Sequence, residues 1–320
     1  MQALRAHPNL NLILVGQQDA ISAELSKHSK ATCERLSIVH ASESVAMDES
    51  PVNALKNKRD SSMRVALNLI KSGVAGACVS SGNTGALMAT ARYVLKMIKG
   101  VSRPAIVRSL PSQHSGSVLM LDLGASVTAE AEHLLQFAVM GSVLATTSSC
   151  PNPKVALLNV GAEVIKGHDT VRFADRLLME SKQINYVGFV EGDDIFLGDI
   201  DVVVCDGFVG NIALKSVEGL AKMLLGSAKE LFQSSIYSKM AAMLSKPILT
   251  ELAQRYNPDN YNGASLLGVQ GIVVKSHGGA RAMAFNQAIT VALHEIEQNV
   301  PEKIAASMDA PLDTDDIDLL

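Results

Sequence analysis

One pattern recurs six times along this 320-residue chain and constrains its fold more than any other feature. A short apolar run ends in a glycine-containing loop, and a stretch with helical spacing of apolar residues follows. The six segments read LNLILVGQQDAISAEL, AGACVSSGNTGALMATARYVLKMI, SVLMLDLGASVTAEAEHLLQFAVMGSVLA, KVALLNVGAEVIKGHDTVRFADRLLM, DVVVCDGFVGNIALKSVEGLAKMLL and GIVVKSHGGARAMAFNQAITVALHEI. Apolar runs without alternation are typical of strands buried on both faces. The pattern therefore predicts a three-layer α/β/α fold with a mostly parallel sheet.

The repeated unit extends through most of the chain, so we expect a single α/β/α domain over residues 1–320. Two stretches depart from the pattern. Residues 227–257 predict a protruding helical hairpin bent at Pro247, because proline interrupts a helix. Residues 309–320, DAPLDTDDIDLL, are acidic and predict a frayed tail.

Composition and charge exclude several classes of protein. The net charge of −4 gives no general attraction to nucleic acid, and 4% aromatic residues argue against a base-stacking surface. The histidines and cysteines form no HExxH or CxxC motif, so no metal site is expected. No apolar stretch is long enough to span a bilayer, and the first residues have too short an apolar core for a signal peptide. We therefore expect a cytoplasmic protein.

The loop SSGNTGALMA, residues 80–89, predicts an anion site at the start of a helix. A helix that begins at Thr84 presents unpaired backbone N–H groups and the positive end of its dipole. Gly82 and Gly85 allow close approach of the backbone to a ligand, while Asn83 caps the helix or donates to an anion. Phosphate is bound in this way without a dedicated cation. Ordinary turn and cap chemistry is the alternative interpretation.

The loop CDGFVGN, residues 205–211, repeats this arrangement, with Asn211 as a cap and Gly207 and Gly210 in the loop. The loops that follow parallel strands gather at one edge of a sheet, so we expect both to face one phosphate or carboxylate site. Neither loop has the GxxxxGK[ST] or the GxGxxG pattern, so neither indicates a nucleotide.

Few charged side chains occur in the predicted loops at this edge. Two acids at strand ends, Asp122 and Asp206, are further binding candidates. Two loop glycines, Gly124 and Gly278, are candidates as well. Acids in such positions either brace loop amides or face a ligand, and both interpretations remain open. The catalytic candidates are His277, Lys275, Lys166 and Glu163. Lysines suit an anionic substrate, and the histidine is either an acid/base group or a hydrogen-bonding fixture of its glycine-rich loop.

At these residues the chain resembles the bacterial phosphate acyltransferases of phospholipid synthesis, the PlsX family. The matching stretches follow the family order over nearly the whole chain: SSMRVAL, SSGNTGALMA, LDLGA, LQFAVMGSVLA, VALLNVG, VCDGFVGNIALK, YNGASLLG and IVVKSHGGA. The resemblance implies transfer of a long acyl group from acyl carrier protein to inorganic phosphate, which yields acyl phosphate. It also implies a homodimer with an isocitrate/isopropylmalate dehydrogenase-like fold and no cofactor. A membrane glycerol-3-phosphate acyltransferase or the membrane surface is the implied further partner.

The sequence departs from the family pattern in two places. The family opens with a strand and a DxMGGDxGP-type loop that are absent here. Either the start lies further upstream, or a central strand is missing and leaves a slot in the sheet. Where the family often has two adjacent acids after NIG, Glu163 is followed here by Val164, so no role that needs both acids is expected.

The resemblance suggests a mechanism that the loops can support. Phosphate is substantially dianionic near neutral pH and attacks a thioester without a strong general base. We expect the helix start at Gly82 to Gly85, with Lys166 or Lys275, to hold phosphate. Backbone amides of CDGFVGN or KSHGGA would stabilise the oxyanion. His277 or a lysine would protonate the leaving sulfur. No covalent enzyme intermediate is required, which fits cysteines that lie inside apolar strands.

Two surface stretches predict contacts with partners. A basic stretch suits the acidic acyl carrier protein, although it also fits a solvated helix face; it comprises Lys56, Lys58, Arg59 and Arg64. An apolar stripe in the helical hairpin comprises Phe232, Ile236, Met240, Met243 and Leu244. The stripe fits a dimer contact, a wall for the acyl chain, or a reversible peripheral contact with the membrane surface.

Three rival functions remain open. A phosphate acetyl- or butyryltransferase would share the fold and use coenzyme A. A metal- and NAD-dependent dehydrogenase of the same superfamily would need clustered aspartates, which the sequence does not show. A non-catalytic membrane-associated scaffold would need neither substrate.

Overall fold

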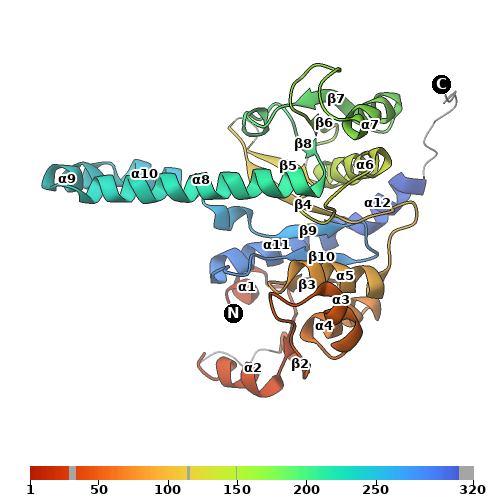
Figure 1. The fold of residues 1–320 in the computed structure, drawn as a ribbon. Helices are drawn as coiled ribbons and strands as arrows, with labels where there is room; N and C mark the ends of the chain where they lie inside the picture. The colour runs from red at the N-terminus through yellow and green to blue at the C-terminus, as the bar shows by residue number, and fades with distance from the viewer. Residues whose placement is uncertain (29–33, 114–115, 149, 310–320) are drawn as a thin grey trace.

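The computed structural model describes residues 1–28, 34–113, 116–148 and 150–309 (Figure 1). Its strands are β1 (Leu12–Gly16), β2 (Leu36–His40), β3 (Ala77–Ser80), β4 (Ala105–Pro111), β5 (Ser117–Leu121), β6 (Lys154–Leu158), β7 (Asn185–Val190), β8 (Val202–Val204), β9 (Ala264–Leu267) and β10 (Ile272–Lys275). Its helices are α1 (Gln2–Ala6), α2 (Gln18–Leu25), α3 (Pro51–Asn57), α4 (Ser62–Lys71), α5 (Thr84–Leu95), α6 (Ala131–Thr147), α7 (Asp169–Glu180), α8 (Gly207–Gln233), α9 (Ile236–Leu244), α10 (Lys246–Arg255), α11 (Ala282–Gln298) and α12 (Val300–Asp309), with 3-10 turns η1 (Asp194–Phe196) and η2 (Pro258–Tyr261). Each of the six predicted units contains its strand and its helix.

Within the described residues, eight strands form one sheet in the order β3-β10-β9-β4-β5-β8-β6-β7, with helices on both sides (Figure 1). The pairs β3–β10, β5–β8, β8–β6 and β6–β7 are parallel. β9 and β4 run antiparallel to their neighbours. The predicted α/β/α fold with a mostly parallel sheet is confirmed.

The parallel strands form two blocks, β3–β10 and β5–β8–β6–β7. The two blocks run in opposite directions, and their carboxyl ends meet near the centre of the sheet. Leu121, the last residue of β5, lies opposite Val107 of β4. Ser265 of β9 lies opposite the same valine, and the preceding Ala264 lies opposite Lys275, the last residue of β10. β5 and β10 therefore end at neighbouring levels of β4. The loops that sequence analysis expects along one edge instead face each other across the middle of the sheet.

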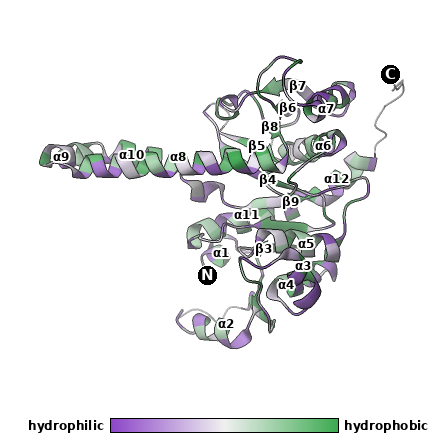
Figure 2. Ribbon diagram, viewed as in Figure 1, coloured by the Kyte–Doolittle hydropathy of each residue, from purple (hydrophilic) through white to green (hydrophobic). Residues whose placement is uncertain are grey.

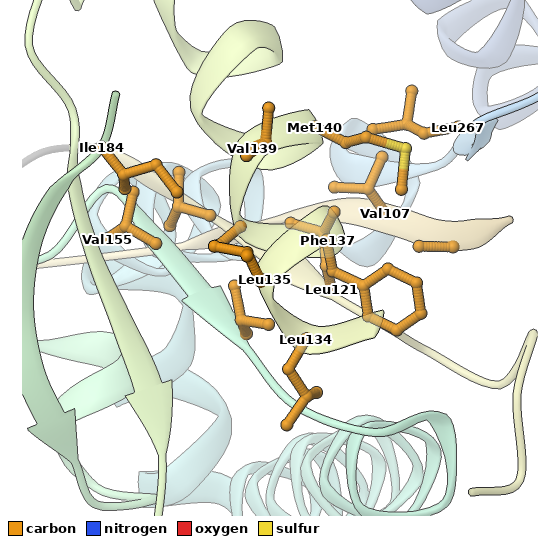
Figure 3. Close-up of a cluster of buried hydrophobic side chains, with 14 of the residues drawn as sticks. Val107, Leu121, Leu134, Leu135, Phe137, Val139, Met140, Val155, Ile184 and Leu267 are labelled. Atoms are coloured by element: carbon orange, nitrogen blue, oxygen red, sulfur yellow. The ribbon is translucent and has the colours of Figure 1, made fainter. Parts of the chain in front are cut away.

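Both faces of the large sheet are buried. Phe137 of α6 and Leu121 of β5 belong to the cluster on one face (Figure 3). Side chains of α7 and α12 belong to the same cluster. Leu87 of α5 and Met120 of β5 belong to the cluster on the other face. Successive residues of β5 therefore point to opposite sides and are both fully buried. This double burial explains why the strand sequences are apolar without alternation.

A two-stranded parallel sheet of β1 and β2 lies apart from the large sheet. A cavity of about 690 Å³ separates β1 from β3 and is also lined by α4 and α11. Residues 12–15 of β1 and residues 77–80 of β3 border it from opposite sides.

A helical arm extends far from the sheet (Figure 1). It is built from the second half of α8 together with α9 and α10, so it begins earlier than the hairpin predicted over 227–257. The chain turns at Ser234 and Ser235 rather than at Pro247. The proline lies in the first turn of α10, where its missing N–H has no helical partner to lose. The predicted tail lies, from residue 310 onward, outside the described residues.

Candidate active site

A cavity of about 360 Å³ lies where the two blocks of the sheet meet. The starts of α5 and α8, the middle of β4 and the loops after β5 and β10 form its walls. Six residues predicted from the sequence line it: Thr84, Gly124, Gly207, Asn211, Lys275 and His277. The offset of the two sheet blocks thus brings together loops that are far apart in the sequence.

The glycines at the start of α8 serve close packing of the protein against itself. A Cβ atom on Gly210 would lie 1.9 Å from the carbonyl oxygen of Asp122, and one on Gly207 would lie 2.4 Å from that of Ser126. Asp206 caps α8 by accepting a hydrogen bond from the backbone N–H of Val209 at 2.9 Å. Gly210 and Asp206 therefore support the cavity wall without lining it.

Asp122 lies beneath the loop that follows β5 and is fully buried. Its carboxylate accepts hydrogen bonds from the backbone N–H groups of Ile106 (2.9 Å), Gly124 (3.1 Å), Ala125 (2.9 Å) and Ser126 (2.7 Å). Burial raises the pKa of Asp122, and these four donors oppose that shift. The residue therefore braces the loop, as one of the two sequence interpretations has it, and does not line the cavity.

The start of α5 is fixed by its cap residue. The Asn83 side chain accepts a hydrogen bond from the backbone N–H of Ala86 at 3.0 Å and donates to the carbonyl oxygens of Met47 and Glu49, both at 2.9 Å. Its polar atoms are thus engaged within the protein, and its neighbour Thr84 is the residue that lines the cavity.

The glycines near this helix start lie outside the cavity wall. The N–H of Gly82 donates to the Ser80 hydroxyl at 3.2 Å. A Cβ atom on Gly85 would lie 2.9 Å from the Pro51 ring. Gly278 lies beside Met47. Gly82 and Gly85 thus have close contacts within the protein, and their predicted role in binding stays a prediction.

The loop after β10 contributes Lys275 and His277. The Lys275 ammonium group is half-buried and donates to the carbonyl oxygen of Ser276. Burial and the positive charge of Lys215 lower the pKa of Lys275. The backbone N–H of Gly279 donates to His277 Nδ1 at 3.1 Å, so a neutral imidazole carries its proton on Nε2. His277 therefore has an N–H donor available for chemistry.

Asn262, which sequence analysis does not single out, holds this loop in place. Its Oδ1 accepts a hydrogen bond from the backbone N–H of His277 at 3.0 Å. Its Nδ2 donates to the Ser276 hydroxyl at 2.8 Å and to the Ala284 carbonyl at 2.7 Å. Since the side chain is buried, these bonds fix the loop to the start of α11.

Three further charged residues line the cavity and are missed by sequence analysis. Arg108 Nη1 and Lys215 Nζ each lie 2.8 Å from a different carboxylate oxygen of Glu218. Arg108 also donates from Nε to the Tyr261 carbonyl at 2.8 Å. Burial opposes ionisation of Glu218, but hydrogen bonds and charges of Lys215 and Arg108 hold its pKa below the ordinary value. Four charged side chains, with Lys275, therefore surround one cavity.

The sequence carries signals for these residues. Arg108 interrupts the apolar run AIVRSLP of β4. Lys215 and Glu218 follow Asn211 by four and seven positions, which places the three on one face of α8. Arg108, Lys215 and Glu218 lie within a strand and a helix, not in the glycine-containing loops.

The structure does not bring Glu163 and Lys166 to the cavity. Both lie in the loop after β6 with exposed side chains, and their charged groups are 3.5 Å apart. Neither residue lines the cavity. Their prediction as catalytic residues rests on the assumption that all loops gather at one edge, whereas the loop after β6 lies beyond β8, away from the centre of the sheet.

The four residues of the basic stretch predicted to bind a carrier protein have different surroundings. Lys58 Nζ lies 2.7 Å from a Glu49 carboxylate oxygen, so its charge is already paired. Arg64 stacks over the Tyr93 ring at 4.7 Å, while Lys56 and Arg59 are exposed.

In the part of the chain that the structure describes, no group of three or more His, Cys, Asp or Glu residues could hold a metal ion. Among the same residues, no helix is long and apolar enough to cross a membrane.

A family model described as "Fatty acid synthesis protein" matches residues 1–303. A phosphate acyltransferase from Legionella pneumophila (strain Paris) is 55% identical over 305 residues, which cover 95% of this chain and 89% of that protein. The chain belongs to the phosphate acyltransferase family. The phosphate acyltransferase of Halorhodospira halophila is 49% identical over 97% of this chain and 90% of its own length. The protein is accordingly an acyltransferase of fatty acid and phospholipid synthesis.

Solved structures resemble the fold at low sequence identity. A phosphotransacetylase from Streptococcus pyogenes aligns with a TM-score of 0.62 and 19% identity over 92% of this chain and 89% of its own. A 4-hydroxythreonine-4-phosphate dehydrogenase from Klebsiella pneumoniae aligns with a TM-score of 0.52 and 13% identity over 89% and 90%. These likenesses show the fold alone and agree with the dehydrogenase-like architecture expected from the sequence.

Proposed function

We propose that this protein transfers a long-chain acyl group from acyl carrier protein to inorganic phosphate and releases acyl phosphate. The observation that carries the proposal is the cavity at the centre of the sheet, where Arg108, Lys215 and Lys275 lie with the starts of α5 and α8. Cations and helix starts both favour a compact anion.

Phosphate is proposed to bind among the three cations. Arg108 and Lys215 are already aligned by Glu218, which reduces the entropy lost when they bind an anion. Lys275 is half-buried and has a lowered pKa, so a nearby dianion would raise that pKa and stabilise the ammonium form. The N–H groups at the start of α5, beside Thr84, supply further donors.

The reaction needs no covalent enzyme intermediate. An oxygen of phosphate attacks the thioester carbonyl carbon, a tetrahedral oxyanion forms, and the carbon–sulfur bond then breaks. In this proposal, backbone N–H groups at the start of α8, near Gly207, stabilise the oxyanion, and one such donor is typically worth about 3 kcal/mol. The Nε2–H of His277 donates a hydrogen bond to the departing thiolate sulfur, and the thiolate then takes its proton from solvent.

The cysteines of the sheet support direct attack. Cys78 is buried, and burial raises the pKa of its thiol to about 12. Cys205 is also buried, and burial, followed by the charges of Asp122 and Asp206, raises its thiol pKa further. Because the thiolate is the nucleophilic form, neither residue suits acyl transfer.

The acyl donor distinguishes the proposal from its nearest rival, a short-chain transferase that uses coenzyme A. The description of the matching family as a fatty acid synthesis protein supports a donor from that synthesis, where chains are carried on acyl carrier protein. The likeness of the fold to a phosphotransacetylase keeps the coenzyme A reaction as the alternative to test.

The arm is proposed to contact a second subunit or the membrane surface. Ile236, Met240, Met243 and Leu244 are exposed, while Phe232 is half-buried, and hydrophobic residues recur along the arm (Figure 2). An exposed apolar surface of this kind marks an interaction site. Flotation with anionic liposomes tests the membrane alternative, because Met240→Asp should abolish flotation. Equal flotation of variant and wild type would rule out the membrane contact. The contact with a second subunit would then be the remaining alternative, and sedimentation of the two proteins would measure it.

The central experiment measures acyl phosphate, trapped as hydroxamate, from phosphate and either palmitoyl-acyl carrier protein or acetyl-coenzyme A. We expect phosphate-dependent product with the carrier-bound chain. Lys275→Gln should raise the phosphate KM by about tenfold or more, since a charge-assisted hydrogen bond contributes about 1.5–3 kcal/mol. Lys166→Gln, an exposed lysine outside the cavity, is the matched control and should leave KM unchanged. Preference for acetyl-coenzyme A, or no product from either donor, would refute the proposal.

A further inference from the structure

A second cavity, of about 510 Å³, lies beside the candidate active site. Its walls include α5, the segment before β4, and Ala125 and Ser126 of the loop after β5. The neighbouring residues Gly124 and Val127 of the same loop line the active-site cavity. One loop therefore separates the two cavities, and a ligand bound in one lies next to the other.

The second cavity is strongly basic. Arg92 lies in the last turn of α5, Lys96 is the residue that ends this helix, and both line the cavity together with Arg103. Arg64 of α4 stacks over the ring of Tyr93 at 4.7 Å, and the Lys96 ammonium lies 5.0 Å from the same ring. These cation–π contacts gather positive charge around one exposed tyrosine.

No carboxylate in the described part of the chain pairs with Arg64, Arg92, Lys96 or Arg103. Nearby Lys58 differs, because its charge is paired with Glu49. Like charges held close together repel one another, so an arrangement of this kind favours a negatively charged partner.

The backbone at Lys96 adds an independent observation. Its φ of 70° and ψ of 173° fall in a region that residues other than glycine rarely adopt. Such strain costs free energy and is found mainly at functional sites. Glycine would relieve this strain but would remove the charged side chain.

We propose that this basic cavity is the docking site for the acidic carrier protein that delivers the acyl thioester. The inference rests on the proposed function and assigns the carrier contact to Arg64, Arg92, Lys96 and Arg103. Three of these cations line the cavity together with the apolar side chains of Leu55, Met88 and Pro104, and Arg64 adjoins it through the Tyr93 ring. This mixture fits a protein surface of carboxylates around apolar side chains. A carrier seated here places its thioester arm beside the loop that borders the active site.

Direct binding tests this docking independently of turnover. Fluorescence anisotropy of labelled acyl carrier protein at low ionic strength gives Kd for the full-length protein and its variants. Arg92→Glu/Lys96→Glu should raise Kd by tenfold or more, since reversed charges repel an acidic partner and weaken electrostatic steering. Arg92→Lys/Lys96→Arg should keep Kd within about twofold. Circular dichroism checks that each variant folds.

The matched control is Lys56→Glu/Arg59→Glu, which makes the same charge change at exposed positions outside the cavity. It should change Kd by less than threefold. An unchanged Kd in the cavity variant, or an equal loss in the control, overturns the docking site. Turnover of wild type with the carrier-bound acyl chain separately decides the proposed function, and the phosphate KM of the cavity variant should equal that of wild type.

Discussion

Glu295 offers a prediction whose size follows from the structure. The side chain lies in α11, is 3% exposed, and accepts a hydrogen bond from the Ser265 hydroxyl of β9. Burial raises its pKa from 4.5 to about 7, and the serine partly opposes this shift. Between these values the folded state retains a proton that the unfolded chain has released. Folding stability should therefore fall as pH rises from 4.5 through 7.

The expected loss is about 3 kcal/mol, because one pKa unit corresponds to about 1.4 kcal/mol. Glu295→Gln keeps the shape and a polar contact with Ser265 but cannot ionise. The variant and wild type should have similar stability at pH 5. At pH 8 the variant should be more stable by up to about 3 kcal/mol, since its buried group carries no charge.

Urea unfolding at pH values from 5 to 8 measures the difference between variant and wild type, in which the titration of other groups largely cancels. Glu297→Gln is the control, because Glu297 lies on the same helix but is exposed. Its difference from wild type should not depend on pH. A flat profile for Glu295→Gln would mean that the carboxylate stays ionised in the fold, and the reasoning from burial would be wrong.

Three further predictions concern the site. In urea unfolding, Gly210→Ala should lower the free energy of unfolding by about 3 kcal/mol or more, because its Cβ would clash with the carbonyl oxygen of residue 122. Gly219 has open space around it, so Gly219→Ala should raise the free energy of unfolding by about 0.5–1 kcal/mol. Phosphate KM should rise with pH as Lys275 loses its proton, and Lys275→Arg, which stays charged, should abolish that rise between pH 7 and 10. Cys205→Ala should retain turnover if it folds; a folded but inactive variant would refute direct attack.

Sequence reasoning succeeds where one physical pattern determines the structure. Strands buried on both faces need continuous apolar runs, and the six runs recognised in the sequence are β1, β3, β5, β6, β8 and β10. The apolar pattern does not predict β2, β4, β7 and β9, because these strands are short or contain polar residues. In β4, Arg108 and Ser109 interrupt the apolar pattern, yet that strand joins the two halves of the sheet.

The site illustrates a different limit. Glycine-containing loops at strand ends indicate the region of the cavity. The sequence does not distinguish a glycine that allows close approach of a ligand from one that allows close packing of the protein's own backbone. Gly210 and Gly85 turn out to meet neighbouring protein atoms. The same ambiguity affects Asp122, whose four amide donors come partly from β4, a strand that the sequence pattern does not reveal.

The charges of the cavity account for the presence of Glu218 in the proposed phosphate site. Arg108, Lys215 and Lys275 bring three positive charges to a half-buried space, where their mutual repulsion would be large without compensation. Glu218 removes one charge and orients two of the cations. The lining side chains then carry a net charge of about +2, equal and opposite to that of a phosphate dianion. A carboxylate ligand would leave one positive charge uncompensated, and a site of this charge therefore favours phosphate over the monoanions of similar size.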